Sequence, residues 1–491
     1  MGCYVLSCVI QLSGVDQIEK SLIMLRVSVV VCIFLAALLS RSEQSRLLGA
    51  ENSQKPNLIY ILMDDAGYAD LSCYGQKKFQ TPNIDRLAAE GLKFTDHYAG
   101  CTVCAPTRCC LMTGLHTGHA LVRGNREVQP EGQAAMPADT VTIPRLLRDA
   151  GYVTGAFGKW GLGAPGSASD PANHFDEFFG YNCQRQAHNY YPTHLWHNRE
   201  KVELDGKTYS HDLIMAESLS FIRASCGAKK PFFCFLPITI PHAAMHVPEE
   251  SAAPFRKEFP QFEQTIGKYS GPLVRNPAAG FAGMMTRLDG QIGELMALLK
   301  ELGIDESTVV MLTSDNGPHK EGGHMPEFFD SNGSLRGIKR DLYEGGIRVP
   351  LIARWPGRIE AGRESSLISA HWDVLPTFCE LAGAKTPENL DGLSFVPMLI
   401  GKEAQARHDF LYWEFPAQGG KQAVRMGKWK GVRLNLMKDP KAPIELYDLS
   451  KDLGEEHNIA DMHPQVVAEI QKAMQDSHVE SPAFQLFGRQ N

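Results

Sequence analysis

Short apolar runs alternate with helical segments along most of this chain, and each run leads directly into polar residues. Residues 57–63 form one such run, which ends at Asp64 and Asp65. Continuous apolar runs of this length are typical of strands buried on both faces of a parallel sheet. The segments between them begin at capping residues and end at glycine, as residues 81–91 do. This alternation predicts an α/β fold, with a large and mostly parallel sheet sandwiched by helices.

The remaining elements follow the same rules. Further strands are expected at residues 92–97, 152–157, 230–237 and 308–313, and further helices at residues 143–150 and 281–302. Ligands of such sheets bind beyond the carboxyl ends of the strands. The residues that follow the strands are therefore the candidate functional residues: Asp64, Asp65, Lys159, His242, Asp315 and Asn316.

The character of the sequence changes near residue 406. Residues 411–414, 423–433 and 444–449 indicate short strands joined by turns, and residues 464–477 indicate a helix. We therefore predict an N-terminal segment at 1–42, a main catalytic domain at 52–405, and a small C-terminal antiparallel α+β domain at 406–491. The 491 residues, 43% of them hydrophobic, are ample for these cores.

The N-terminus has the pattern of a secretory signal peptide. From Met24, one positive charge at Arg26 precedes the apolar residues 27–39, and polar residues follow. We expect the protein to be exported to a periplasm, the medium or the secretory-pathway lumen. The acidic and basic residues before Met24 are unusual ahead of such a signal, so Met24 is an alternative start to Met1. Membrane attachment is expected only if this segment stays uncleaved.

The net charge also limits the partners. A net charge of −7 and a pI near 6.2, without a basic stripe, argue against nucleic-acid binding.

Residues 101–110 contain four cysteines, a proline and an arginine. Pro106 fits the first turn of a helix that ends at Gly114. This helix places Cys104 at its N-terminus, where backbone N–H groups favour an anion, with Arg108 one turn further on. Cys104 is therefore a candidate nucleophile beside a fixed cation.

Asp64, Asp65, Asp315 and Asn316 offer only oxygen ligands. Ca²⁺ fits such a set best and Mg²⁺ less well, and the lack of paired histidines argues against zinc. Taken separately, each pair is also compatible with an ordinary turn after a strand. Adjacent charges at the end of a buried strand are costly without a counter-ion, however, which favours a metal site.

Several motifs together resemble the sulfatases, the formylglycine-dependent, arylsulfatase-like enzymes of the alkaline-phosphatase-like superfamily. The matching motifs occur in the family's order across nearly the whole mature chain: Asp64-Asp65, Cys104-x-Pro106-x-Arg108, Gly158-Lys159-Trp160, Pro241-His242, Asp315-Asn316 and Arg336-Gly-Ile-Lys339. The resemblance implies an alkaline-phosphatase-like fold and hydrolysis of a sulfate ester. The implied substrate is a sulfated small molecule or carbohydrate.

The resemblance also implies the roles of these residues. Cys104 is converted to formylglycine by a formylglycine-generating or equivalent maturation enzyme, and one hydroxyl of the hydrated aldehyde attacks sulfur. One calcium ion per active site is held by the pairs Asp64-Asp65 and Asp315-Asn316 and by residue 104. It neutralises the sulfate together with the cations Arg108, Lys159 and Lys339. His242 or a lysine protonates the leaving alcohol. The second hydroxyl then loses its proton, and the aldehyde returns as sulfate is expelled.

The chain departs from the family pattern at two places. Many sulfatases have a histidine two residues after the lysine, whereas this chain has Gly161. His119, His319 and His324 are the candidate replacements, although each fits a surface or structural role better. The pair Cys109-Cys110 replaces the small residues usual in the family.

Other interpretations remain open at this point. A phosphatase or phosphonate-ester hydrolase of the same superfamily would use the same groups, and a non-catalytic binding homologue would retain the fold. The Cys101-x-x-Cys104 pair suggests a redox or metal protein, but no second such pair follows. The nine cysteines after the signal leave room for one or two disulfides. Residues 183–197 and 250–277 are expected to be loops that recognise the alcohol.

Overall fold

The computed structural model describes residues 55–488 of the chain, which belong to one compact unit. The predicted signal peptide at residues 1–42 lies outside the described residues and stays a prediction. Within residues 55–488, no helix has both the length and the apolar character needed to cross a membrane.

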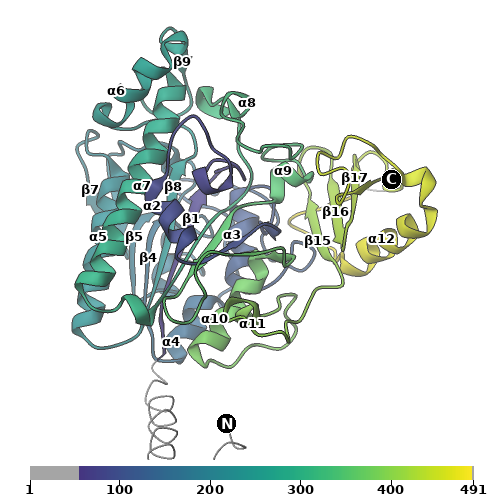
Figure 1. Ribbon diagram of the computed structural model, residues 1–491, viewed down its shortest axis with the longest axis horizontal. Coiled ribbons are helices and arrows are strands. Elements are labelled where there is room, and N and C mark those ends of the chain that lie inside the picture. Colours follow the sequence, from purple (N-terminus) through teal and green to yellow (C-terminus); the bar gives the residue numbers. More distant parts are fainter. Residues whose placement is uncertain (1–54, 489–491) are drawn as a thin grey trace, which may run out of the picture. The chain divides into compact units, whose positions relative to one another are not determined.

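A ten-stranded sheet forms the centre of the molecule (Figure 1). Its strands in spatial order are β13 (Arg363–Ser365), β2 (Leu92–Phe94), β12 (Leu351–Arg354), β11 (Thr308–Ser314), β1 (Asn57–Asp64), β8 (Phe232–Pro241), β4 (Val153–Lys159), β5 (Glu177–Tyr181), β6 (His194–His197) and β7 (Glu200–Glu203). The five central strands, from β11 to β5, are parallel. Antiparallel pairs occur only towards the edges. The mostly parallel sheet predicted from the sequence is confirmed.

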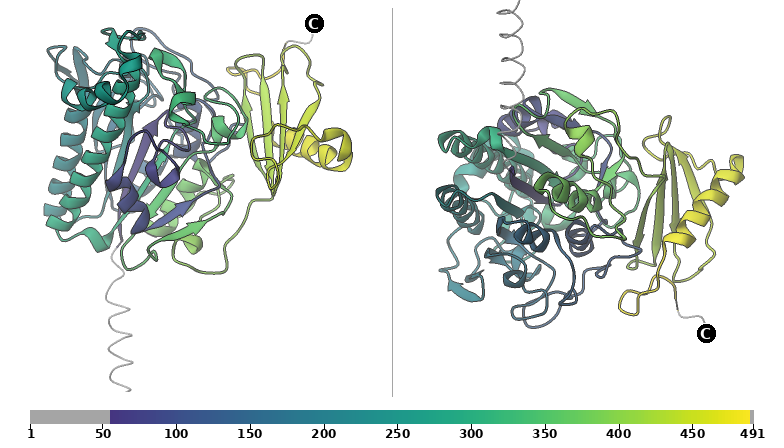
Figure 2. Two further views of the ribbon diagram at one scale, coloured as in Figure 1. Left: turned by 45° about the horizontal axis from the view of Figure 1, so that its top comes forward. Right: turned by 90° about the horizontal axis from the view of Figure 1, so that it is seen from below.

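Helices cover both faces of this sheet, as Figures 1 and 2 show. The covering helices are α2 (Pro82–Ala89), α5 (Ser210–Gly227) and α7 (Pro277–Glu301) on one face, and α3 (Cys104–Thr113), α4 (Ile143–Asp149) and α10 (Val374–Ala382) on the other. Alternate residues of β1 therefore enter two separate cores. Leu58 and Leu62 pack with the second group of helices, whereas Ile59 and Ile61 pack with the first. This explains why β1 is apolar throughout rather than alternating.

The C-terminal part forms its own antiparallel sheet of four strands. These are β15 (Leu411–Phe415), β16 (Lys421–Met426), β17 (Trp429–Leu434) and β18 (Ile444–Asp448), and α12 (Pro464–Ser477) packs on one face. Figure 2 shows α12 alongside this sheet. The predicted α+β character is confirmed, while the boundary at residue 405 stays a prediction. The predicted long strand at 423–433 is a hairpin, because a turn at Gly427 separates β16 from β17.

Three other expectations need correction. The expected strand 92–97 is two strands, β2 and β3 (His97–Tyr98), because β3 pairs with β14 (Ser369–Ala370) outside the main sheet. Residues 183–197 are not all loop, since they include β6. Residues 250–277 include most of α6 (Glu249–Glu258), which buries Ala252 and Phe255 despite an internal proline.

The remaining elements are short. They are β9 (Ile266–Gly267), β10 (Val274–Arg275), α8 (Pro326–Phe329), α9 (Glu344–Ile347) and α11 (Val396–Leu399), with 3₁₀ turns between them.

Candidate active site

The ends of two neighbouring strands bring the acidic residues together. Strands β1 and β11 pair in register, with Met63 opposite Ser314, so the residues that follow them are neighbours. The backbone N–H of Asp65 donates to Asp315 Oδ1 at 3.1 Å, and Asn316 Nδ2 donates to Asp65 Oδ1 at 2.7 Å. Asp65 has a φ of 64°, a conformation that non-glycine residues adopt at a cost and that is frequent at functional sites. This end of the sheet therefore holds a compact set of oxygen atoms.

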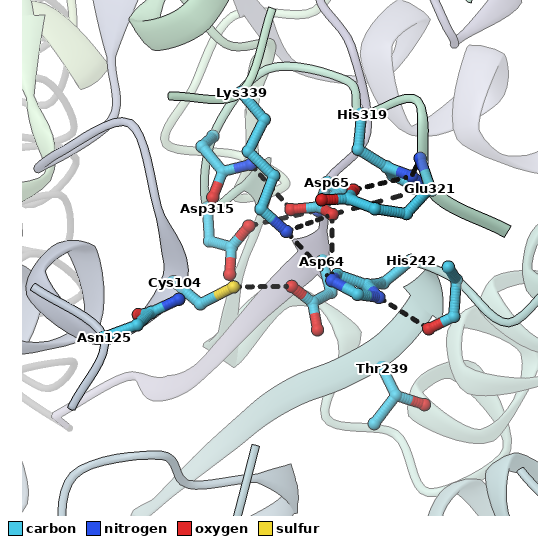
Figure 3. Close-up of polar contacts among 12 residues, drawn as sticks. Asp64, Asp65, Cys104, Asn125, Thr239, His242, Asp315, His319, Glu321 and Lys339 are labelled. Atoms are coloured by element: carbon cyan, nitrogen blue, oxygen red, sulfur yellow. Dashed lines mark hydrogen bonds and ion pairs between the residues drawn. The ribbon is translucent and has the colours of Figure 1, made fainter. Parts of the chain in front are cut away.

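Cys104 reaches the same place from helix α3. It is the first residue of the helix, and Gly114 ends the helix in the left-handed conformation with its N–H bonded to Cys110 O at 2.9 Å. The backbone N–H of Ala105 donates to Asn125 Oδ1 at 3.0 Å, which occupies one of the free donors at the helix start. The Cys104 thiol donates to Asp64 Oδ1 at 3.4 Å (Figure 3).

The encoded thiol is a poor nucleophile where it lies. Cys104 is only 1% exposed, and burial, reinforced by the charge of Asp64, raises its pKa far above the ordinary range. The reactive form of cysteine is the thiolate, and here burial and the charge of Asp64 outweigh the opposing effect of Lys159 and Lys339. An unmodified thiol at this position is therefore protonated at neutral pH.

Three buried cations surround Cys104 and the carboxylates. Lys159 Nζ donates to Asp64 Oδ2 at 2.6 Å, and Lys339 Nζ donates to Asp65 Oδ2 at 2.7 Å. Arg108 donates through Nη2 to Asp315 Oδ2 at 3.0 Å and through Nη1 to the Lys159 carbonyl at 2.6 Å. Each cation thus faces a different carboxylate of the site.

These opposite charges determine the ionisation of the site. Burial alone would lower the pKa of Lys159, but Asp64 outweighs it and the pKa is raised. Burial likewise opposes ionisation of Asp64, yet the charges of Lys159 and Arg108 hold its pKa well below the usual range. Both groups are therefore charged at neutral pH. Asp315 differs, because burial and the neighbouring charge of Asp64 raise its pKa to about 7 despite Arg108.

His242 lies at the end of β8 with its ring between Asp65 and Lys339. Its Nδ1 lies 2.6 Å from the Ala243 carbonyl, to which only a protonated nitrogen can donate. Its Nε2 lies 2.9 Å from Lys339 Nζ, and burial together with Lys339 lowers the pKa of this histidine well below the usual range. The imidazole is therefore neutral, and Nε2 accepts a hydrogen bond from the ammonium group.

The structure brings all of the predicted site residues into one cluster. They are Asp64, Asp65, Cys104, Arg108, Lys159, His242, Asp315, Asn316 and Lys339, each of them buried. Lys339 is the site residue farthest from β1 in the sequence. It reaches the cluster because its backbone N–H bonds to the carbonyl of Pro318, just after β11.

Of the three histidines proposed to replace the one absent at Gly161, only His319 lies beside the cluster. Its Nε2 is 4.0 Å from Asp65 Oδ2, and its ring stacks on His242 with 5.1 Å between ring centroids. His119 instead pairs with Asp391 at 2.9 Å, and His324 stacks on Phe281.

Some residues near the cluster were not predicted from the sequence. His188 stacks on His242 with 4.1 Å between centroids, and Glu321 contacts His319. His188 ends a short 3₁₀ helix (Gln186–His188) and Glu321 begins another (Glu321–Gly323), and neither belongs to a motif.

The cysteines argue against the redox interpretation. All nine cysteines within residues 55–488 are free, so no disulfide occurs in this part of the chain. Cys101 Sγ lies 3.9 Å from the carbonyl of Glu414 and is not bonded to Cys104. Cys109 and Cys110 are buried in the apolar core, as small apolar side chains would be.

Two family models match the chain. The model described as "Sulfatase" matches residues 56–384, more than half of the chain, and the model described as "N-sulphoglucosamine sulphohydrolase, C-terminal" matches residues 337–481. The chain belongs to the sulfatase family. The resemblance predicted from the motifs is confirmed, including the alkaline-phosphatase-like fold, and this sulfatase is a sulfuric ester hydrolase.

Individual relatives agree with the family models. This sulfatase is 34% identical over 450 residues to arylsulfatase A of Homo sapiens, covering 84% of each chain. It is 31% identical over 491 residues to N-acetylgalactosamine-6-O-sulfatase of Bacteroides thetaiotaomicron, covering 87% of this chain and 93% of that protein. A solved structure, Ps i-CgsB in complex with k-i-k-neocarrahexaose, superposes with a TM-score of 0.75 at 29% identity and covers 86% of this chain and 92% of that one.

Sulfatases are generally metal-dependent, and this one has a buried cluster that can bind a cation. Asp64, Asp65, Cys104 and His242 offer ligand atoms within 4.8 Å of one another. Oxygen atoms dominate once Asp315 and Asn316 are included.

Proposed function

We propose that this sulfatase hydrolyses the sulfate ester of a carbohydrate, with residue 104 as a formylglycine nucleophile. The observation that carries the proposal is the set of three buried cations, Arg108, Lys159 and Lys339, that surrounds residue 104. A sulfate group has three oxygen atoms besides the one it shares with the alcohol. Cations that are already positioned stabilise the charge on these oxygens at no cost of reorganisation.

Conversion of Cys104 to formylglycine resolves the conflict between its position and its chemistry. The buried thiol is protonated, whereas a hydrated aldehyde offers a hydroxyl group and, after the transfer, a second hydroxyl that releases the sulfate. Because Cys104 is 1% exposed, a maturation enzyme needs the unfolded or partly folded chain as its substrate. We therefore infer a formylglycine-generating or equivalent partner that acts before folding ends.

A calcium ion fits the oxygen atoms at the ends of β1 and β11. Asn316 Oδ1 is buried and has no hydrogen-bond partner, as expected of an atom whose natural partner is a cation. Asp64, Asp65 and Asp315 would complete the set, which is the ligand chemistry of Ca²⁺ rather than of zinc. The cation would supply further charge neutralisation at the sulfate oxygens.

Lys339 is the residue best placed to supply a proton to the leaving alcohol. Its ammonium group donates hydrogen bonds to the Asp65 carboxylate and to Nε2 of His242, which is neutral. As the hydroxyl oxygen of residue 104 bonds to sulfur, the bond from sulfur to the alcohol oxygen breaks, and that oxygen takes the proton. His242 orients Lys339 through its neutral Nε2, and the proton that the attacking hydroxyl releases restores the ammonium form of Lys339.

A polar cavity next to the site supports a carbohydrate as the alcohol. The cavity has a volume of about 250 Å³ and is lined by Glu131, Arg185, Asn189, Thr193 and His194, among others. Two of its lining residues, Asn189 and Ser270, directly follow His188 and Tyr269, whose rings pack against the ring of His242. Carboxylate, amide and imidazole groups can pair with the hydroxyl groups of a sugar. The named relatives that act on N-acetylgalactosamine sulfate agree with this substrate class.

The turnover of matched aryl esters tests this function. We expect the purified enzyme to hydrolyse 4-nitrophenyl sulfate with a much higher kcat/KM than 4-nitrophenyl phosphate. Cys104→Ala is expected to abolish this turnover, because no hydroxyl remains to attack sulfur. Predominant phosphate hydrolysis would instead favour the phosphatase or phosphonate-ester hydrolase of the same superfamily.

A further inference from the structure

A buried glutamine occupies the space beside Gly161, two residues after the site lysine. Gly161 has a φ of 73°, and a Cβ built on it would lie 3.0 Å from Gln184 Nε2 and 3.2 Å from Gln184 Cγ. The side chain of Gln184 therefore fills the volume that a side chain at position 161 would enter.

Pairing of the chain beyond the sheet fixes Gln184 in this place. Strands β4 and β5 pair up to Lys159 opposite Tyr181. The pairing continues as Trp160 N–H bonds to the Tyr181 carbonyl at 2.9 Å and Gly161 N–H bonds to the Asn182 carbonyl at 3.3 Å. Gln184 is thus carried on an extension of β5 that runs alongside the residues after Lys159, and it is only 4% exposed.

Gln184 and Arg108 each have an unsatisfied donor close to the Cβ position of Gly161. Gln184 Nε2 is buried without a hydrogen-bond partner among the described residues. The Cβ position of Gly161 lies 3.6 Å from Arg108 Cδ, and the Nε bonded to that carbon is also buried without a partner. The other nitrogens of Arg108 already bind Asp315 and the Lys159 carbonyl.

Leaving buried N–H groups unpaired is costly, so two adjacent ones call for an acceptor supplied from outside the chain. A sulfate oxygen is such an acceptor, because it carries negative charge and can accept from both donors. Arg108 already faces the carboxylates beside Cys104, which places this acceptor next to the reacting residue.

We propose that Gln184 is a sulfate-binding residue, whose Nε2–H donates, together with Arg108 Nε–H, to one oxygen of the sulfate ester at residue 104. This inference rests on the proposed function. It adds a neutral donor to the three cations.

Two substitutions separate this role from a structural one. Gln184→Met keeps the size of the side chain and removes the donor, and we expect kcat/KM for 4-nitrophenyl sulfate to fall about 10- to 100-fold, the worth of one hydrogen bond to a charged group. Gln184→Glu places a negative charge against the sulfate and is expected to lower kcat/KM further. If the glutamine oxygen instead oriented Arg108, a glutamate would do so better, so an active Gln184→Glu variant would overturn the proposal.

The matched control is Gln422→Met, in β16 of the C-terminal sheet. Gln422 is also buried, and its Nε2 donates to the Tyr412 hydroxyl at 2.8 Å, so this variant is expected to lower Tm and leave kcat/KM unchanged. Equal losses of kcat/KM in both glutamine-to-methionine variants would contradict a specific role for Gln184.

A binding measurement distinguishes failure of this inference from failure of the proposed function. In a Cys104→Ala background, which cannot turn over, calorimetry with 4-nitrophenyl sulfate is expected to show about tenfold weaker affinity when Gln184→Met is added. Unchanged affinity there overturns the inference alone. Absence of sulfatase turnover in the unsubstituted enzyme overturns the proposed function, while the binding comparison still decides the role of Gln184.

Discussion

Asn316 is the residue whose environment points most directly to a metal ion. Its Nδ2 bonds to Asp65, while its Oδ1 is buried and unpaired. A protein seldom leaves a buried amide oxygen without a partner unless a ligand supplies one. The oxygen of this side chain is therefore expected to contribute to both metal affinity and stability.

The substitution Asn316→Leu keeps the size of the side chain and removes its oxygen. Calcium is expected to raise the Tm of the unsubstituted protein. At a concentration one hundred times the Kd, binding should stabilise the folded state by about 2.7 kcal/mol. Asn316→Leu is expected to lose this calcium-dependent shift and to weaken turnover at least tenfold. Thermal melts with calcium or a chelator, with metal content by mass spectrometry, measure both effects.

Asp391→Asn is the control for this experiment. Asp391 binds His119 and the backbone of His116, outside the cluster around Cys104. This variant is expected to melt at a lower temperature and to keep the full calcium-dependent shift. A calcium response that survives in Asn316→Leu would argue against the proposed ligand set.

At the residue scale, the sequence predicts the residues that follow strands and misses those that do not. Asp64, Lys159 and His242 could be identified because each follows an apolar run. Gln184 lies in a turn and His188 in a short 3₁₀ helix, and their position depends on pairing between β4 and β5, which are separated in sequence by a loop. Such contacts cannot be derived from local periodicity.

At the scale of the elements, two close contacts between strands hold Lys159 in position. Gly158 precedes Lys159 in β4, and a Cβ on it would lie 2.1 Å from the Pro237 carbonyl of β8. A Cβ on Gly180, its partner in β5, would lie 1.9 Å from the Gly158 carbonyl. These three strands can approach this closely only because glycine is present at both positions.

Gly158→Ala is accordingly expected to separate β4 from β8 and to shift Lys159 away from Asp64. We expect a loss of about 2 to 5 kcal/mol in the free energy of unfolding, from backbone strain and overpacking together. The kcat/KM for 4-nitrophenyl sulfate is expected to fall at least tenfold. Chemical denaturation and steady-state kinetics on the same preparation measure the two effects.

Gly151→Ala separates the cost of backbone strain from the cost of the clash. Gly151 precedes the same strand with a φ of 88°, and its Cβ would meet nothing within 4 Å. This variant is expected to lose only about 1 kcal/mol and to keep full activity. If Gly158→Ala were no worse than Gly151→Ala, close strand packing would not be what positions Lys159.

Element boundaries were predictable where a local signal marks them. Pro106 and Gly114 bracket α3, and the apolar runs match β1 and β11. The start of α7 was missed because two glycines follow its Asn276 cap, although the cap itself bonds to Ala279 N–H. α6 was missed because Pro254 lies inside it, and tertiary packing of its apolar face overrides the weak local propensity.

At the scale of the whole molecule, the C-terminal part is attached to the rest by buried polar contacts as well as by the chain. Lys430 of β17 donates to Glu344 Oε1 at 2.7 Å, and Arg336 donates to the carbonyl of Glu455 at 2.6 Å. Glu344 and Arg336 flank the segment that carries Lys339. The C-terminal sheet therefore supports the loop that supplies a site lysine.

The junction near residue 406 includes a histidine that is expected to make stability depend on pH. His408 Nε2 lies 2.8 Å from Asp373 Oδ1, just before α10. Burial lowers the pKa of His408, but the Asp373 carboxylate outweighs burial and the pKa is raised above its usual value. Because the pKa of His408 is higher in the folded state, the pair with Asp373 stabilises the protein in full below pH 6.5. This stabilisation disappears as pH rises through the pKa of the folded state.

His408→Gln is expected to remove this contribution. The unsubstituted protein should exceed the variant in stability by about 1 to 2 kcal/mol at pH 5.5, the worth of a buried hydrogen bond to a charged group. The difference should shrink towards pH 8.5, where the histidine is neutral. Melting curves across this range measure it, with His457→Gln as a control, because His457 is exposed. A difference that grows with pH would contradict the assigned pair.

The overall architecture was predictable from the sequence because it depends on repeated local patterns. Alternating apolar runs and capped helices imply the parallel sheet. The cooperation of the C-terminal sheet with Lys339 was not predictable, since Glu344 and Lys430 are 86 residues apart and carry no shared motif. Burial of paired charges becomes visible only in three dimensions.

The mass of the peptide that contains residue 104, taken from a preparation that hydrolyses 4-nitrophenyl sulfate, tests the central claim most directly. Formylglycine at position 104 gives a peptide that has lost one sulfur and two hydrogens and gained one oxygen relative to the encoded cysteine. We predict that this mass dominates and that its fraction tracks the specific activity across preparations. Full activity with an entirely unmodified Cys104 would contradict the proposed nucleophile.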